Sequence, residues 1–193
     1  MTKSTAKERG AWRHRGFLAN NPSFRIVKGN SKFQTIPKDR RKQFSIRLAT
    51  IHDCRKCAGV LLRQLAEHGT DASEEKLVKV LERVLSDKRN GFILSARSRG
   101  NIVGVAYVAI ILSAEHCGKV GWLEELYVMP EYRFQGIGAA LLNAVLERAR
   151  KLGLVATDLE VDAAHRRAET LYRRFGFRPL DRSRWVRTLE QDV

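Results

Sequence analysis

The alternation of hydrophobic and polar positions becomes regular at Phe44, and its period changes along the chain. Residues 44–50 alternate, which predicts a strand. Residues 53–69 and 73–86 repeat apolar side chains every three or four positions, which predicts two helices with one buried face each. Ser73 stands at the expected N-cap of the second helix, before two glutamates that the helix dipole favours.

The second half of the chain repeats this change of period. Two alternating runs meet at residues 99–101, which predicts a β-hairpin. A strand is predicted at 120–128, and a helix follows at 136–152, ending on Lys151 and Gly153 as helices often do. The remaining predictions are a strand at 155–161, a helix at 166–175 and a final strand at 183–189.

The predicted order is therefore β-α-α-β-β-β-α-β-α-β. It indicates a layered α+β protein whose mixed, mostly antiparallel sheet is flanked by helices. One parallel crossover is expected through the 136–152 helix. The chain of 193 residues suits one domain, which we place at 44–193.

Composition narrows the setting. No apolar run approaches the roughly 20 residues that span a bilayer, and the first residues lack the apolar segment of a secretory signal. Three cysteines are too few for a disulfide framework. The sequence therefore predicts a cytoplasmic protein that does not enter the membrane.

The net charge of +15 is concentrated at the start of the chain. Residues 1–45 hold 12 Lys and Arg against Glu8 and Asp39, a net charge of +10. Residues 1–43 have no steady apolar period, so they are predicted to form an extended or disordered arm. Such an arm could contact nucleic acid, but a solvated tail is the favoured interpretation.

The stretch EYRFQGIG (131–138) lies between a predicted strand and a predicted helix. Two glycines at such a turn let a phosphate approach the helix N-terminus, and Arg133 adds a positive charge. A Walker loop is excluded because Gly-Lys-Ser/Thr is missing, and a dinucleotide fingerprint lacks its third glycine at Leu141. The turn therefore predicts another diphosphate ligand.

Two motifs here resemble those of a known family. LYVMPEYRFQGIG (126–138) is similar to the acetyl-CoA-binding motif of the GNAT N-acetyltransferases, and TLYRRFGF (170–177) is similar to their later Leu-Tyr-x-x-x-Gly-Phe signature. The resemblance covers about 46–190. Within the superfamily, the layout is most similar to the diamine (spermidine/spermine-type) acetyltransferases. The resemblance implies a GNAT-like fold, acetyl-CoA as cosubstrate, and a homodimer.

The resemblance also assigns residues to the cofactor. Phe134 stands where many members have Gly, and His165 where many have an Asn that contacts the cofactor. The two glycines nearest the helix remain, so we expect the pyrophosphate site to be kept. The cofactor-binding residues implied are Leu126, Tyr127, Val128, Arg133, Phe134, Gln135, Gly136, Ile137, Gly138, Ala139 and His165.

Amine acetylation needs a base for the ammonium, a polarised carbonyl and a proton donor for the thiolate. Glu124 and Glu125 are adjacent on a strand, so only one can face the acceptor unless a bulge intervenes. The resemblance favours Glu124 as the base, Tyr172 as the proton donor, and a backbone N–H near Tyr127 or Val128 as the group that polarises the carbonyl.

Acidic residues also bear on the acceptor. Glu115 and Glu125 are predicted to bind the substrate, and Asp53 and Glu67 lie on the first helix, which helps to wall the acceptor pocket in this superfamily. Such a pocket would attract a polyamine. Cys54 and Cys57 form a C-x-x-C pair, but no second pair supplies further ligands, so we predict no metal.

The sequence therefore predicts direct acetyl transfer from acetyl-CoA to a primary amine, and a small polyamine is the expected acceptor. Two alternatives stay open. The acceptor could be a protein lysine or N-terminus, or the chain could be a non-enzymatic nucleic-acid-binding module that uses the basic arm.

Overall fold

The computed structural model describes residues 44–161 and 166–189. The predicted arm at 1–43 and the cofactor residue predicted at His165 lie outside the described residues. Among the helices that are described, none has the length and apolar character needed to cross a membrane.

The strands form one five-stranded sheet in sequence order. The first four are antiparallel, and the fourth and fifth are parallel, which confirms the predicted mixed sheet with one parallel crossover. Arg99 and Gly100 both have positive φ, as a two-residue hairpin turn requires. The strands are β1 (Ser45–Leu48), β2 (Gly91–Ser98), β3 (Asn101–Ser113), β4 (Gly118–Val128) and β5 (Ala156–Leu159).

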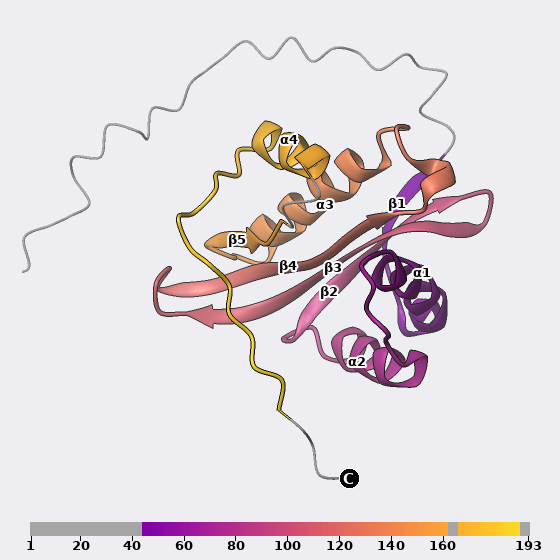
Figure 1. The fold of residues 1–193 in the computed structure, drawn as a ribbon, viewed down its shortest axis with the longest axis horizontal. Helices are drawn as coiled ribbons and strands as arrows, with labels where there is room; N and C mark the ends of the chain where they lie inside the picture. Colours follow the sequence, from indigo (N-terminus) through magenta and orange to yellow (C-terminus); the bar gives the residue numbers. More distant parts are fainter. Residues whose placement is uncertain (1–43, 162–165, 190–193) are drawn as a thin grey trace, which may run out of the picture. The chain divides into compact units, whose positions relative to one another are not determined.

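All four predicted helices are present. They are α1 (Cys54–Glu67), α2 (Glu74–Ser86), α3 (Ile137–Lys151) and α4 (Arg166–Arg174), with short 3-10 turns at Ile51–Asp53 and Pro130–Tyr132. Ser73 caps α2 as expected, because its Oγ accepts a hydrogen bond from the Lys76 N–H. Two helices lie on each face of the sheet, which gives three layers (Figure 1).

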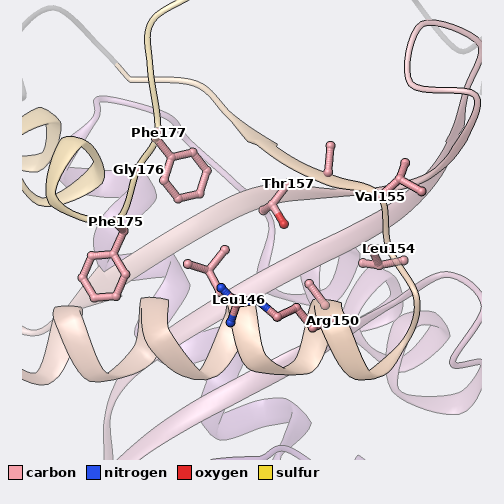
Figure 2. Close-up of a pocket in the computed structure, with 10 residues that line it drawn as sticks. Leu146, Arg150, Leu154, Val155, Thr157, Phe175, Gly176 and Phe177 are labelled. Atoms are coloured by element: carbon pink, nitrogen blue, oxygen red, sulfur yellow. The ribbon is translucent and has the colours of Figure 1, made fainter. Parts of the chain in front are cut away.

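One face of the sheet is covered by α3 and α4. The buried stripe of α3, which includes Leu141 and Val145, packs against alternate residues of the central strands such as Ala106 and Val108. A pocket of about 270 Å³ remains between the end of α3, the start of β5 and Phe175–Phe177. Most of the residues that line it have apolar side chains, and the Arg150 side chain lies at one side (Figure 2).

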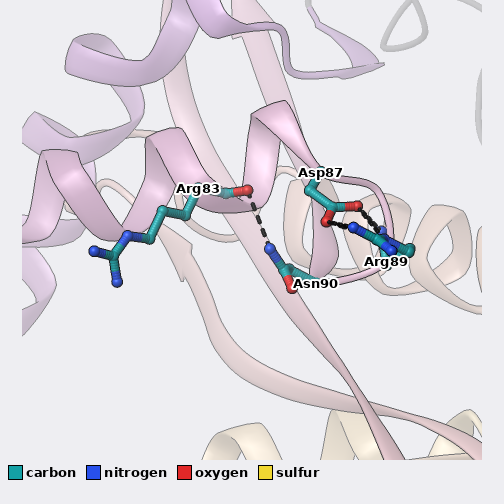
Figure 3. A network of polar contacts seen from close by, with 4 residues as sticks. All are labelled: Arg83, Asp87, Arg89 and Asn90. Atoms are coloured by element: carbon teal, nitrogen blue, oxygen red, sulfur yellow. Dashed lines mark hydrogen bonds and ion pairs between the residues drawn. The ribbon is translucent and has the colours of Figure 1, made fainter.

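The opposite face is covered by α1 and α2. Cys57 and Leu81 are fully buried here against Ile93 and Val105. Burial raises the pKa of the Cys57 thiol to about 12, so this cysteine packs as a neutral apolar side chain. Beyond α2, two polar contacts accompany the turn toward β2. The Asn90 side-chain amide donates a hydrogen bond to the Arg83 carbonyl of α2, and Asp87 forms an ion pair with Arg89 (Figure 3).

A β-bulge interrupts the pairing of β3 with β4 at Glu124. Tyr107 pairs with Glu125 and the next residue of β3 pairs with Leu123, so Glu124 has no partner on β3. The bulge reverses the alternation: Leu123 packs on the α3 face, whereas Tyr127 packs on the α1 face. The bulge required to turn both glutamates toward one site is therefore present.

The prediction of a strand at 183–189 is wrong. This segment forms no strand within the described residues, and Trp185 is 92% exposed. Arg182 and Arg184 form ion pairs with Glu115 and Glu160. These contacts of the segment with the domain are side-chain ion pairs and not strand pairing. An alternating pattern gives strand propensity, but a strand also needs a partner edge.

Candidate active site

The strands β4 and β5 separate halfway along β4, and the main cleft begins there. Their parallel pairing ends at Leu123 and Leu159, while β4 continues to Val128. Beyond the last pair, the edge of β4 is open toward a cleft of about 890 Å³. The sequence could predict the parallel crossover but not where the two strands separate.

The cleft gathers most of the predicted site residues. Gln135, Ala139 and Glu115 are not among its lining residues, and His165 lies outside the described residues. The predicted residues that line the cleft are Glu124, Glu125, Leu126, Tyr127, Val128, Arg133, Phe134, Gly136, Ile137, Gly138 and Tyr172.

The N-terminus of α3 forms one end of the cleft. Gly136 is the N-cap, with a φ of 83°, and no side chain of the described residues caps the helix. The first intrahelical bond runs from the Ala140 N–H to the Gly136 carbonyl. The N–H groups of the first turn therefore have no intrahelical partner, and they form a site suited to an anion.

Two further residues define the shape of this turn. A Cβ on Gly138 would make only ordinary contacts of 3.8 Å or more with the rest of the protein. Packing therefore does not require glycine at this position, whereas close approach of a ligand would. Phe134 has a φ of 63°, a backbone conformation that favours glycine. Its side chain is 84% exposed.

Arg133 is held beside the turn by several contacts. Its Nη2 donates to Glu67 Oε2 at 2.8 Å, and its Nε donates to the Val128 carbonyl at 2.9 Å. The guanidinium lies over the Tyr127 ring, 5.3 Å from the centroid. The Tyr127 hydroxyl donates to Glu67 at 2.6 Å, and these two hydrogen bonds lower the pKa of Glu67. Arg133 thus links the end of α1 to the segment that leads into the first turn of α3.

The Val128 peptide faces the open edge of β4. The next N–H along, that of Met129, donates to Val103 on β3. Because successive peptide groups of a strand point to opposite edges, the Val128 N–H points away from β3. The hydrogen bond from Arg133 to the Val128 carbonyl agrees with this direction. The polarising N–H predicted near Tyr127 or Val128 therefore has a donor on the cleft side at Val128.

Glu125 is the carboxylate with the most unusual environment in the cleft. Burial raises the pKa of Glu125 to about 7, and the neighbouring charge of Glu124 adds to this rise. A hydrogen bond from the Gln64 amide lowers it in part. A carboxyl group that titrates near neutral pH can take up and release a proton under physiological conditions.

Tyr172 approaches the same cleft from α4. Burial, together with the nearby charge of Glu125, raises the pKa of Tyr172 to about 12. The ring packs edge to face against Phe177, with centroids 5.8 Å apart. Tyr172 therefore keeps its proton throughout the physiological pH range and can act as a hydrogen-bond donor.

The outer part of the cleft combines two exposed charges of opposite sign. Glu124 is exposed, and Arg184 reaches the cleft from the C-terminal segment. Arg184 forms an ion pair with Glu160 and lies over the Trp122 ring, 5.6 Å from the centroid. A cation is thus already accommodated between an aromatic ring and carboxylates.

Two acids predicted near the acceptor lie elsewhere. The Glu115 carboxylate pairs with Arg182, at 2.7 Å, and this hydrogen bond lowers the pKa of Glu115. Asp53 pairs with Arg97 at 2.6 Å near the start of α1. Neither lines the cleft, whereas Glu67 does.

Sequence reasoning missed Gln64, Glu160 and Arg184, all of which line the cleft. Gln64 carried a usable signal, because it is a polar residue on the apolar stripe of α1, seven positions after Cys57. Glu160 and Arg184 carried none, since both sit in exposed segments whose positions depend on tertiary contacts.

Comparison with known proteins identifies the family that this chain resembles. The model of the acetyltransferase (GNAT) family matches residues 58–177. The aminoalkylphosphonate N-acetyltransferase of Salmonella typhimurium is 28% identical over 129 residues, which cover 61% of this chain and 84% of that protein.

Solved structures agree on the fold. A possible acetyltransferase from Clostridium difficile 630 superimposes with a TM-score of 0.67 at 22% identity, covering 78% of this chain and all of that one. A predicted acetyltransferase with acetyl-CoA from Clostridium acetobutylicum gives a TM-score of 0.64 at 19% identity, covering 75% and 96%. The predicted GNAT-like fold is confirmed.

Proposed function

The chain belongs to the acetyltransferase (GNAT) family and is an acetyl-CoA-dependent N-acetyltransferase, and we propose that its acceptor is a small cationic amine, with a linear polyamine as the specific hypothesis. The observation that carries this proposal is the position of Glu125. Its carboxyl group lines the same cleft as the first turn of α3 and Tyr172, and burial raises its pKa to about 7.

Acetyl-CoA fits the α3 end of the cleft. The N–H groups at the start of α3 would bind its pyrophosphate, and the missing Cβ at Gly138 leaves room for close approach. The thioester would then lie along the open edge of β4. There the Val128 N–H can donate to the thioester oxygen and stabilise the charge that develops in the tetrahedral intermediate.

Glu125 would act as the general base. The acceptor arrives largely as an ammonium with a pKa near 10, so one proton must leave before nitrogen can attack. The ionised Glu125 attracts the ammonium and takes this proton, directly or through water. Glu124, which the sequence resemblance favours for this role, lies beside it, and its charge supports the attraction.

The C–N bond forms as the carbonyl π electrons move onto oxygen, which gives the tetrahedral intermediate. When the carbonyl forms again, the C–S bond breaks and its electron pair leaves with sulfur. A phenol with a pKa of about 12 does not transfer its proton fully to a thiolate whose thiol has a pKa near 8.5. The Tyr172 hydroxyl would therefore stabilise the departing sulfur by a hydrogen bond. The attacking nitrogen supplies the protons, one to the thiolate and one released overall.

The charges of the cleft support a cationic acceptor. Glu124, Glu125 and Glu160 all line the cleft, where the Arg184 guanidinium is paired with Glu160 and lies over the Trp122 ring. A linear polyamine could place its reacting amine at Glu125 and a distal ammonium near Glu160. The Salmonella relative is named for aminoalkylphosphonates, so those amines belong in the same comparison.

The test is mass-spectrometric detection of acetylated products from acetyl-CoA and a panel of polyamines, monoamines, aminoalkylphosphonates, aminoglycosides and peptides. We expect polyamines to react with the highest kcat/KM. Glu160→Gln should raise the KM of a polyamine more than that of a monoamine, whereas Glu147→Gln, an exposed acid of α3 outside the cleft, should change neither. If only peptides were acetylated, the polyamine hypothesis would be wrong and a protein acceptor would be supported.

A further inference from the structure

Gln64 is a polar side chain in an otherwise apolar position of α1. It is 7% exposed, although it stands on the same helical stripe as the buried Cys57 and Leu61. Its amide Nε2 donates a hydrogen bond to Oε2 of Glu125, 61 positions further along the chain. Its carbonyl Oε1 is also buried and has no hydrogen-bond partner among the described residues.

An unpaired buried carbonyl is unfavourable, because the group has lost its water without gaining a partner. Gln64 nevertheless lines the cleft, next to the carboxyl group that the proposed function assigns as the base. A donor that enters the cleft would satisfy this oxygen. The acceptor amine is such a donor, since an ammonium has three N–H groups and Glu125 can bind only part of them.

We propose that Gln64 completes the amine-binding site: its Nε2 holds the Glu125 carboxylate in place, and its Oε1 accepts a second N–H of the acceptor amine. This inference rests on the proposed function. The two contacts would fix the direction of the nitrogen lone pair, because one N–H is bound by Gln64 while Glu125 removes another. The site then recognises a primary amine by two N–H groups and selects against a tertiary amine.

Several groups from other elements also face Glu125 and act on its protonation. Glu124 of β4 raises the pKa of Glu125, and the Gln64 amide lowers it. Tyr172 of α4 stays protonated beside it. Tyr107 is its register partner on β3, and burial raises the pKa of Tyr107, with Glu124 adding to this rise. None of these donates to Glu125 in place of Gln64 within the described part of the chain.

Other charges of the cleft contribute at longer range. Glu67 is paired with Arg133 and Tyr127, and Arg184 is paired with Glu160. Because each of these charges has its own partner, its net effect on Glu125 is small. Burial and the Glu124 charge both favour the protonated form of Glu125, and the Gln64 hydrogen bond is the contact that favours the charged form. Its removal should therefore raise the pKa of Glu125.

The test uses the full chain with carbon-13 in its glutamate carboxyl groups, followed by NMR during a pH titration, with Glu125→Gln to identify the resonance. We expect a midpoint near pH 7 in the wild type. Gln64→Met keeps the side-chain length but has no amide, so the midpoint should move to higher pH. Val60→Ala, one turn earlier on α1, removes buried apolar volume only and should leave the midpoint in place.

Kinetics test the second contact with the best acceptor of the amine panel. Gln64→Met should raise the KM for the amine about tenfold, as expected for a lost hydrogen bond to a charged group, while the KM for acetyl-CoA stays within about twofold. Gln64→Glu keeps an acceptor oxygen, so it should bind the amine closer to wild type while raising the titration midpoint further.

A Gln64→Met variant with an unchanged NMR midpoint and an unchanged amine KM would overturn the inference and leave Gln64 a packing residue. The NMR measurement needs no substrate. Absence of turnover with every amine would therefore refute the proposed function, while a shifted midpoint would still support the positioning of Glu125 by Gln64.

Discussion

Glu124 and Glu125 are neighbours in the sequence but experience different surroundings. The bulge leaves Glu124 exposed, whereas Glu125 is partly buried and is hydrogen-bonded to Gln64 of α1. Loss of water makes the charged form of Glu125 less favourable, and the charge of Glu124 adds to this effect. The two residues can therefore have different roles: Glu125 acts as the base, and the charge of Glu124 raises the basicity of Glu125.

The residue-scale prediction concerns this division. Glu125→Gln should lower kcat about 100-fold, the usual contribution of a general base. The wild-type rate should rise with pH through about 7, because Glu125 is an effective base only after it has lost its proton, and this limb should vanish in the variant. The measurement is kcat/KM for the amine against pH with saturating acetyl-CoA, because this ratio reports the pKa of Glu125 before the amine binds.

Glu124→Gln provides the comparison. It should retain most of kcat, and its rising limb should move to lower pH, because removal of the neighbouring negative charge makes Glu125 easier to ionise. If Glu124→Gln instead lost more activity than Glu125→Gln, the base would be Glu124.

At the scale of elements, the first turn of α3 combines two glycines with different roles. Gly136 has a positive φ that an L side chain rarely adopts, so the backbone itself requires glycine there. Gly138 lies inside the helix at a position where a Cβ would be accommodated. We propose that a ligand close to the helix accounts for the absence of that Cβ.

The element-scale prediction is that Gly138→Ala separates stability from binding. The variant should be as stable as wild type or more stable by up to about 1 kcal/mol, because alanine favours the helical backbone. Acetyl-CoA should bind at least tenfold more weakly, because the new methyl group occupies the approach to the helix N-terminus. Thermal unfolding and calorimetry measure the two effects.

Gly59→Ala is the matched control for this change. Gly59 lies inside α1, and a Cβ there would meet nothing within 4 Å. The substitution should give a similar gain of about 0.5–1 kcal/mol without altering acetyl-CoA binding. Equal affinities in both variants would mean that the cofactor does not approach Gly138.

At the scale of the whole molecule, charge and site are separated along the chain. Residues 1–45 hold +10 of the net +15, while the residues that line the cleft all lie between Gln64 and Arg184. We propose that residues 1–43 form a basic arm outside the catalytic domain. At low salt its field would attract the anionic acetyl-CoA and repel a cationic amine.

Deletion of residues 1–43 should therefore leave kcat within about twofold and have opposite effects on the two substrates. At low salt, kcat/KM should fall for acetyl-CoA and rise for a polyamine. At about 0.5 M salt both differences should disappear, because the screening length is then only a few ångströms. Steady-state kinetics at several salt concentrations measure this. A large loss of kcat at every salt concentration would make the arm part of the site.

The sequence by itself determined the elements and the cofactor turn. Helical and strand periods are local, so α1 to α4 and β1 to β5 were predictable. The positive φ of Gly136 is a backbone requirement that is also local, and the two GNAT motifs pointed to acetyl-CoA. The alternating pattern at 183–189 misled for the same reason: it gives the propensity of a strand but not the partner edge that a strand needs.

The tertiary structure alone decided which side chains meet. The bulge at Glu124 and the separation of β4 from β5 depend on register between strands, which no single segment encodes. They bring Gln64, Glu125 and Tyr172 together from α1, β4 and α4. The pKa of Glu125 follows from that meeting, because desolvation and neighbouring charge are properties of the assembled site and not of the residue.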